Sequence, residues 1–142
     1  LFPTLVEEYH KSRSQFKSRF KKALVMYSLV GGGIALVLWI FSQEVIGMVY
    51  GDKFLPSADI LDVLSGAILL FFINFLLSNV LIASGQEKVN TWNLVGATVL
   101  NVIFNLAWIP QYGAIGAAWA TLFCEVGLVV ILSLQVKKVI NS

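Results

Sequence analysis

The sequence predicts an all-α polytopic membrane protein whose four transmembrane helices form two antiparallel hairpins. Of its 142 residues, 58% are hydrophobic and 13% are charged, whereas about 25% are charged in an ordinary soluble domain. The mean hydropathy is +0.82. The charges are clustered and leave three uncharged runs, Ala23–Gln43, Val63–Gln86 and Val89–Cys124. These observations exclude a soluble globular domain.

The lengths of the uncharged runs predict four crossings. The first run has 21 residues, which as a helix rising about 1.5 Å per residue crosses a hydrocarbon layer of about 30 Å once. The last run has 36 residues and contains Pro110 followed by Gly113, a pair that divides it into two helices joined by a tight turn. We place the membrane domain at residues 23–136, with spans at 23–43, 60–84, 91–109 and 114–136. Residues 1–22 precede it, and residues 137–142 form a tail.

The distribution of basic residues predicts the orientation. With four spans, both chain ends lie on one side of the membrane. Nine of the ten Lys and Arg residues then lie on that side, and Lys53 alone lies on the other. The positive-inside rule makes the side with the ends cytoplasmic. Trp39, Trp92, Trp108 and Tyr112 fall near span ends, where amphipathic rings favour the headgroup level. We expect a multi-pass protein of the cytoplasmic membrane.

The segment before the first span contains two parts. The chain begins at Leu1 without a methionine, and Leu1–Val6 is an apolar stub that contains Pro3. We interpret this stub as the end of a preceding helix, so we expect a C-terminal fragment of a longer protein. In the stretch from Tyr9 to Lys22, Phe16 and Phe20, followed by Leu24, recur every four positions among bases. This stretch is either an amphipathic helix on the inner membrane surface or a solvated cytoplasmic connector, and we favour the connector.

The residue types needed for soluble-enzyme chemistry are scarce. His10 is the single histidine and Cys124 the single cysteine, and they lie in different environments. They cannot assemble a zinc site or a Ser-His-acid group. Gly31–Gly33 lie within a span and no lysine follows them, unlike the glycines of a phosphate-binding loop. We expect no enzymatic activity, metal site, organic cofactor or nucleic-acid partner.

A carboxyl group and neighbouring polar side chains lie inside the last two spans. Glu125 lies at the centre of the fourth span, where inserting a charged acid costs roughly 2.5–3.5 kcal/mol, so we expect it to be protonated or partnered. In a hairpin that turns at Pro110, residues at equal depth have numbers that sum to about 225. Glu125 is then level with Asn101, and Thr121 with Asn105. Within each helix the two polar residues are four positions apart and so lie on one face. The sequence therefore predicts two hydrogen-bonded contacts between the helices of the hairpin, which we call rungs.

The first hairpin contains a comparable arrangement. Equal-depth sums near 105 place Asn74 opposite Gly31–Gly33, and close approach there would let its amide reach a backbone carbonyl. Small residues also recur every four positions in the last span, which favours close helix packing. The five candidate polar residues have two interpretations: they form interhelical hydrogen bonds of about 0.6 kcal/mol each, or they line a polar pathway. We favour the first.

One stretch resembles a known family. In NLVGATVLNVIFNLAWIPQYGAIGAAWATLFCE (Asn93–Glu125), an asparagine-rich helix ends in Ile-Pro-x-x-Gly, and Gly-Ala-Ala, then Thr, then Glu follow in the next helix. This stretch resembles the C-terminal region of polysaccharide and lipid-linked oligosaccharide flippases, such as O-antigen flippases. LFPTL (Leu1–Leu5) and VYGDKF (Val49–Phe54) resemble the same family. The resemblance covers almost the whole chain in the expected order.

The resemblance implies a member of the multidrug, oligosaccharidyl-lipid and polysaccharide exporter superfamily, whose complete proteins have about twelve to fourteen helices in two lobes. This chain would supply four spans of the second lobe. Its partners would be the bilayer, the remaining helices and a lipid-linked saccharide that is moved by alternating access. The chain departs from the family pattern because no Lys or Arg lies in a predicted span to hold a diphosphate.

Two alternatives remain. One is a cation-coupled multidrug exporter of the same superfamily, in which Glu125 exchanges a proton. The other is a membrane scaffold that binds partners without transporting anything.

Overall fold

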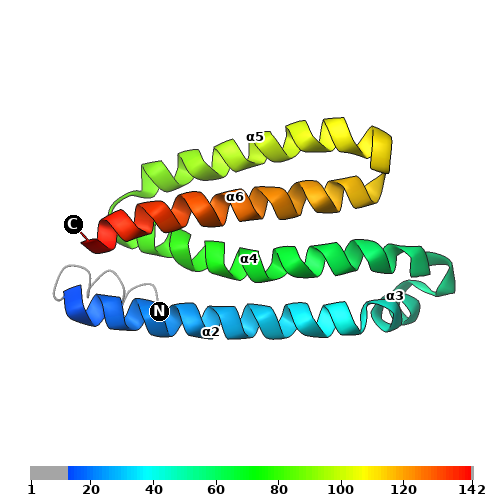
Figure 1. The fold of residues 1–142 in the computed structure, drawn as a ribbon, viewed down its shortest axis with the longest axis horizontal. Coiled ribbons are helices and arrows are strands. Elements are labelled where there is room, and N and C mark those ends of the chain that lie inside the picture. The colour runs from blue at the N-terminus through cyan, green and yellow to red at the C-terminus, as the bar shows by residue number, and fades with distance from the viewer. Residues whose placement is uncertain (1–12, 142) are drawn as a thin grey trace.

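The computed structural model describes residues 13–141, and its helices follow one another with short connections. They are α2 (Arg13–Ile40), α3 (Ser42–Tyr50), the 3₁₀ helix η1 (Asp52–Ser57), α4 (Ala58–Ala83), α5 (Glu87–Tyr112) and α6 (Ala114–Asn141). No strand occurs within residues 13–141. The four long helices lie side by side in the order α2, α4, α6, α5 (Figure 1). The protein is therefore an all-α polytopic membrane protein.

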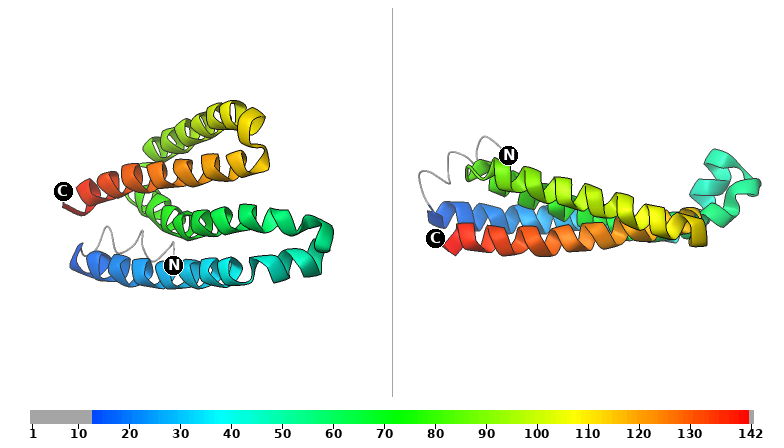
Figure 2. Two further views of the ribbon diagram at one scale, coloured as in Figure 1. Left: turned by 45° about the vertical axis from the view of Figure 1, so that its right-hand side comes forward. Right: turned by 90° about the horizontal axis from the view of Figure 1, so that it is seen from above.

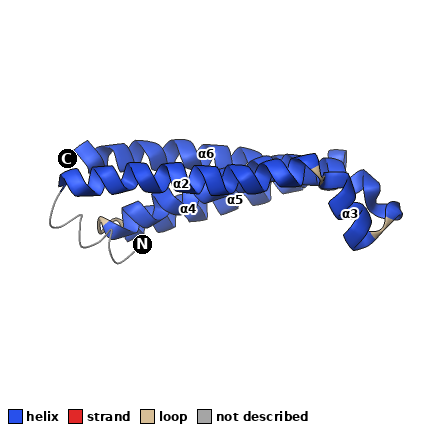
Figure 3. Cartoon of the chain, turned by 90° about the horizontal axis from the view of Figure 1, so that it is seen from below, coloured by secondary structure: helices blue, strands red, loops and turns tan. Residues whose placement is uncertain are grey.

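Each long helix is able to cross a bilayer. Helical stretches that are long and apolar enough cover Ser14–Ile40, Asp52–Ala83, Glu87–Tyr112 and Ala114–Ile140. Three connections lie at the ends of the bundle, and the long helices run lengthwise between them, with α5 inclined to the others (Figures 2 and 3). The first residues of α2, the α4–α5 turn and the last residues of α6 share one end. We call this the base-rich end, because six exposed lysines lie there: Lys17, Lys21, Lys22, Lys88, Lys137 and Lys138.

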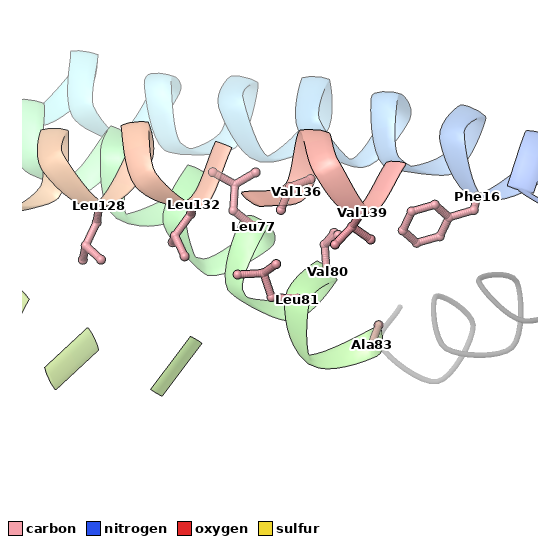
Figure 4. Packing of buried hydrophobic residues seen from close by; sticks show 9 residues of the cluster. All are labelled: Phe16, Leu77, Val80, Leu81, Ala83, Leu128, Leu132, Val136 and Val139. Carbon is pink, nitrogen blue, oxygen red and sulfur yellow. The ribbon is translucent and has the colours of Figure 1, made fainter. Parts of the chain in front are cut away.

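The segment expected to be a solvated connector is helical where the structure describes it. Residues 13–22 form the first turns of α2, and Phe16 is buried with 2% of its surface exposed. It lies in a hydrophobic cluster contributed by α2, α4 and α6 (Figure 4): Phe16, Leu77, Val80, Leu81, Ala83, Leu128, Leu132, Val136 and Val139. The solvated connector stays a prediction for these residues, since their lysines are exposed while Phe16 packs between helices. The stub Leu1–Val6 lies outside the described residues.

Glycines with positive φ end two of the long helices. Gly85 (φ +76°) follows α4, and Gly113 (φ +64°) separates α5 from α6. The Gly113 amide donates to the Ile109 carbonyl at 2.8 Å. Helix α5 therefore continues through Pro110 to Tyr112, beyond the predicted end at residue 109. A proline near a helix end removes one backbone donor, whereas the glycine with positive φ, which other residues rarely adopt, turns the chain.

Two glycines allow neighbouring segments to approach closely. A Cβ atom on Gly31 would lie 2.8 Å from Phe72 Cβ of α4, and a Cβ atom on Gly116 would lie 2.8 Å from the Trp108 carbonyl oxygen. Real Cβ atoms do not approach that closely, so neither position accepts a side chain without movement of its neighbour. The glycines thus fix the spacing of α2 against α4 and of α6 against α5, as small residues do in membrane helix pairs.

Candidate functional site

The Glu125 carboxyl group is hydrogen-bonded to α4. The Asn74 side-chain amide nitrogen donates to Glu125 Oε2 at 2.7 Å and to the Glu125 backbone carbonyl at 3.0 Å. Asn74 is 5% exposed, and Glu125 is half-buried. A carboxyl group at this depth needs a partner because hydrocarbon offers no water to solvate it. The structure shows Asn74 as the hydrogen-bond partner of Glu125 where the sequence predicted Asn101, and Asn101 lines the same cavity as Glu125.

The direction of Asn74 follows from helix geometry. Phe72 of α4 faces Gly31 of α2. A residue two positions further along an α-helix is rotated by about 200°, so Asn74 points away from α2 and toward α6. Its depth relative to Gly31–Gly33 agrees with the expectation, but its amide reaches the Glu125 carbonyl and not a carbonyl of α2. The predicted contact of Asn74 with the triglycine is therefore wrong.

The second expected rung, between Thr121 and Asn105, does not form. The Thr121 hydroxyl donates to the Ala117 carbonyl at 3.1 Å within α6. Asn105 donates to Asn101 Oδ1 at 2.8 Å within α5. Each polar group finds a partner one turn away on its own helix, a common alternative to a bond across helices. Oδ1 of Asn74 and Oδ1 of Asn105 are two of the four buried side-chain oxygens without a hydrogen-bond donor among the described residues; the others belong to Asp62 and Asn90.

Three of the five candidates line one cavity between α5 and α6. The cavity has a volume of about 320 Å³, and its polar walls are Thr98 and Asn101 of α5 with Thr121 and Glu125 of α6. We call it the polar groove. Asn74 connects to it through Glu125, and Asn105 connects through Asn101. The candidates predicted from the sequence thus gather around one cavity, although their hydrogen-bond partners differ from those predicted.

One interhelical polar pair was not among the candidates. Asn93 of α5 donates to Gln135 Oε1 at 2.6 Å, and Gln135 donates back to Asn93 Oδ1 at 3.3 Å. Their numbers sum to 228, which is close to the equal-depth sum of about 225 for this hairpin. The depth rule that was applied to Glu125 could therefore have found this pair if it had been extended toward the base-rich end.

The polar groove offers neutral hydrogen-bonding groups and one carboxyl group. The Asn74 amide can donate to Glu125 whether the carboxyl group is ionised or protonated, because a protonated carboxyl group keeps an acceptor oxygen. Asn101 and Thr98 supply further amide and hydroxyl groups. Amide and hydroxyl groups can bind a hydroxyl-rich ligand through hydrogen bonds, and the carboxyl group of Glu125 can in addition bind a proton. Within residues 13–141, no three His, Cys, Asp or Glu side chains lie close enough together to hold a metal ion.

Comparison with known proteins identifies the family. The MatE family model matches residues 10–107, which is well over half of the chain. The chain belongs to the MatE family. This assignment agrees with the exporter superfamily that the motifs indicated.

Two relatives of this MatE protein illustrate its context. It is 32% identical over 125 residues to the uncharacterized membrane protein MJ1068 of Methanocaldococcus jannaschii, covering 87% of this chain and 24% of that protein. It is 33% identical over 82 residues to the probable low-salt glycan biosynthesis flippase Agl15 of Haloferax volcanii, covering 58% of this chain and 17% of that protein. The chain thus spans about a quarter or less of the length of these relatives. No solved structure matches it significantly.

Proposed function

We propose that this chain forms part of the second lobe of a flippase that moves lipid-linked oligosaccharide or polysaccharide repeat units across the cytoplasmic membrane by alternating access. The observation that carries the proposal is the similarity to a protein named as a glycan biosynthesis flippase, within the MatE family. The orientation we propose places the base-rich end in the cytosol, in accordance with the positive-inside rule.

The chemistry of the polar groove supports a saccharide substrate. Its polar walls present amide, hydroxyl and carboxyl groups, which donate to and accept from sugar hydroxyls. A saccharide that passes through the protein must repeatedly break and re-form these hydrogen bonds. Neutral amide and hydroxyl groups allow this because they form no strong ion pair with the substrate. Within residues 13–141, every lysine lies at the base-rich end except Lys53, which lies in η1. In this proposal the groups that bind the diphosphate inside the membrane therefore belong to the remaining helices.

The packing supports movement of α2, α4 and α6 as one unit. These three helices share the hydrophobic cluster at the base-rich end (Figure 4), and Asn74 ties α4 to α6 near the middle of the membrane. Helix α5 rests mainly on α6. Alternating access requires such packed groups of helices to rock against the rest of a transporter.

Substitutions in the polar groove test the proposed function. In the complete transporter, we expect Thr121→Val and Asn101→Leu to slow the appearance of lipid-linked glycan in the outer leaflet, because both remove groups that face the groove. Thr91→Val is the matched control, since the Thr91 hydroxyl also donates to a carbonyl four residues earlier, Glu87 O at 2.9 Å, but lies outside the groove. Normal glycan transport by Asn101→Leu and Thr121→Val would contradict a role of the groove in transport.

A proton-coupled drug exporter is the second candidate, and the Asn74–Glu125 hydrogen bond is the observation that favours it. Glu125→Gln keeps an acceptor for Asn74 but cannot release a proton. Under this candidate, Glu125→Gln abolishes proton-coupled drug efflux while the protein still folds. Normal efflux by Glu125→Gln would eliminate the coupling role and leave Glu125 as a structural partner of Asn74. A scaffold that transports nothing would show neither glycan nor drug transport.

A further inference from the structure

A cavity at the base-rich end lies among α2, α4 and α6. Its volume is about 280 Å³. It is bordered by Phe20 and Leu24 of α2, Ile73 and Leu77 of α4, and Ser133 and Lys137 of α6. Among the described residues, it shares no lining residue with the polar groove. We call it the basal pocket.

The basal pocket is polar toward the helix ends and apolar toward the membrane interior. Helix α6 ends at the base-rich end (Figure 1), so Lys137 lies about 6 Å nearer to that end than Ser133 does. Lys137 is exposed. A lysine in such a position lays its apolar stem along apolar walls and extends its ammonium group toward water. Headgroup chemistry and hydrocarbon chemistry therefore follow one another along this pocket.

Two further exposed lysines lie beside the basal pocket. Lys17 precedes Phe20 by three positions, and Lys21 precedes Leu24 by three positions. Residues three positions apart are neighbours on the surface of a helix. Both α2 residues that border the pocket thus have a lysine neighbour on the side toward the base-rich end, in addition to Lys137 of α6.

Within residues 13–141, the acidic side chains are far from these lysines. Helix α2 contains no Asp or Glu. The acid of α6 is Glu125, twelve positions or about 18 Å from Lys137. The acids of α4 lie toward its other end, where Asp62 is eleven positions from Ile73. Glu87 lies on α5, which packs mainly on α6. The positive charge beside the pocket therefore calls for an anion from another molecule.

We propose that the basal pocket binds an anionic phospholipid of the leaflet that faces the base-rich end. The phosphate lies beside the Lys137 ammonium group, and the first part of one acyl chain lies against Phe20, Leu24 and Leu77. The Ser133 hydroxyl donates to an oxygen that links the headgroup to the chain. Charge favours this occupant over a further transmembrane helix, because an apolar helix would leave the lysines without a counterion. Each lysine near an anionic leaflet adds to the attraction.

A lipid in the basal pocket contacts three helices at once. Helices α2 and α6 each pack mainly on α4, so a lipid between them adds a contact that the protein does not make itself. A ligand that binds the folded protein and not the unfolded chain raises the thermal unfolding midpoint. The proposal applies to the protein whichever substrate it moves.

Thermal unfolding of the complete transporter in the presence of defined lipids tests the proposal. The protein in mild detergent is titrated with phosphatidylglycerol, with phosphatidylcholine of the same acyl chains, or with inorganic phosphate. Lys137→Gln removes the charge at the pocket. Lys138→Gln is the matched control, because Lys138 is the exposed neighbour of Lys137 and does not line the pocket. Ser133→Phe fills the pocket without changing a charge, and Leu134→Phe is its control, because Leu134 is exposed and does not line the pocket.

We expect phosphatidylglycerol to raise the unfolding midpoint, and phosphatidylcholine and inorganic phosphate to leave it unchanged at the same concentrations. Lys137→Gln requires about fivefold more phosphatidylglycerol than Lys138→Gln for half of the effect, because one lysine near an anionic lipid is lost. Ser133→Phe abolishes the effect and Leu134→Phe retains it.

Three results would overturn the proposal. The first is an equal phosphatidylglycerol requirement of Lys137→Gln and Lys138→Gln, which leaves only a general attraction of the base-rich end to anionic lipid. The second is equal stabilisation by phosphatidylcholine or by inorganic phosphate. The third is a crosslink from a photoreactive residue at position 133 to another helix of the transporter, which would mean that protein and not lipid occupies the pocket.

Discussion

Replacing Asn74 by leucine isolates the contribution of the contact between α4 and α6. Leucine has a similar volume but removes the donor to both Glu125 oxygens. Hydrogen bonds between membrane helices contribute about 0.6 kcal/mol each, and leaving a buried polar group without a partner costs about 1–3 kcal/mol. We therefore expect Asn74→Leu to lower the free energy of unfolding by about 2–4 kcal/mol. Glu125→Gln keeps an acceptor for Asn74 and should cost less than about 1 kcal/mol.

The assay is reversible unfolding in mixed micelles, with helicity followed by circular dichroism. Asn79→Leu is the matched control, because Asn79 also lies on α4 but donates to the Phe75 carbonyl of its own helix at 2.8 Å. The double variant Asn74→Leu with Glu125→Leu should recover part of the loss, since it leaves no carboxyl group without a donor. If Asn74→Leu costs no more than Asn79→Leu, the bond does not hold α4 against α6.

Three further predictions concern packing and the second polar pair. Gly31→Ala should destabilise the protein by about 1–3 kcal/mol through overpacking, because its Cβ atom would lie 2.8 Å from Phe72 Cβ. Gly33→Ala is the control and should be neutral or stabilising. Equal thermal unfolding midpoints of the two variants would contradict this prediction. Gly116→Ala should shift the α5–α6 hairpin because its Cβ atom would approach the Trp108 carbonyl oxygen, and an unchanged crosslinking yield between cysteines introduced on the two helices would refute it. Gln135→Leu should cost about 1 kcal/mol by removing the partner of Asn93, and the double variant with Asn93→Leu should recover part of that loss in the same unfolding assay.

The sequence was sufficient for the fold, because span number and order depend on local hydropathy and turn residues. Each uncharged run predicts the span that it contains, and Pro110 with Gly113 predicts the turn at that position, so each prediction needs only one stretch of chain. The equal-depth rule is also consistent with the Asn93–Gln135 hydrogen bond, which joins two helices linked by a short turn, although this pair was not predicted.

The partner of Glu125 could not be predicted in the same way. Helices α4 and α6 are not neighbours in the chain, so no turn fixes their relative depth, and the rule was applied only within the two hairpins, α2–α4 and α5–α6. The rotation of each helix also matters, because Asn74 at the depth of the triglycine points away from it. In addition, Thr121 and Asn105 form hydrogen bonds within their own helices. Such bonds compete with bonds between helices, and the depth of a residue does not predict which of the two forms.

The central claim is that the chain crosses the membrane four times with its base-rich end in the cytosol, and cysteine accessibility tests it most directly. Single cysteines replace Lys53, Lys88 or Lys138 in a Cys124→Ala background and are treated with a membrane-impermeant maleimide in intact cells. We predict labelling of Lys53→Cys in intact cells, and labelling of Lys88→Cys and Lys138→Cys only after the membrane is permeabilised. Labelling of Lys53→Cys and Lys138→Cys from the same side of the membrane would contradict the four-span account.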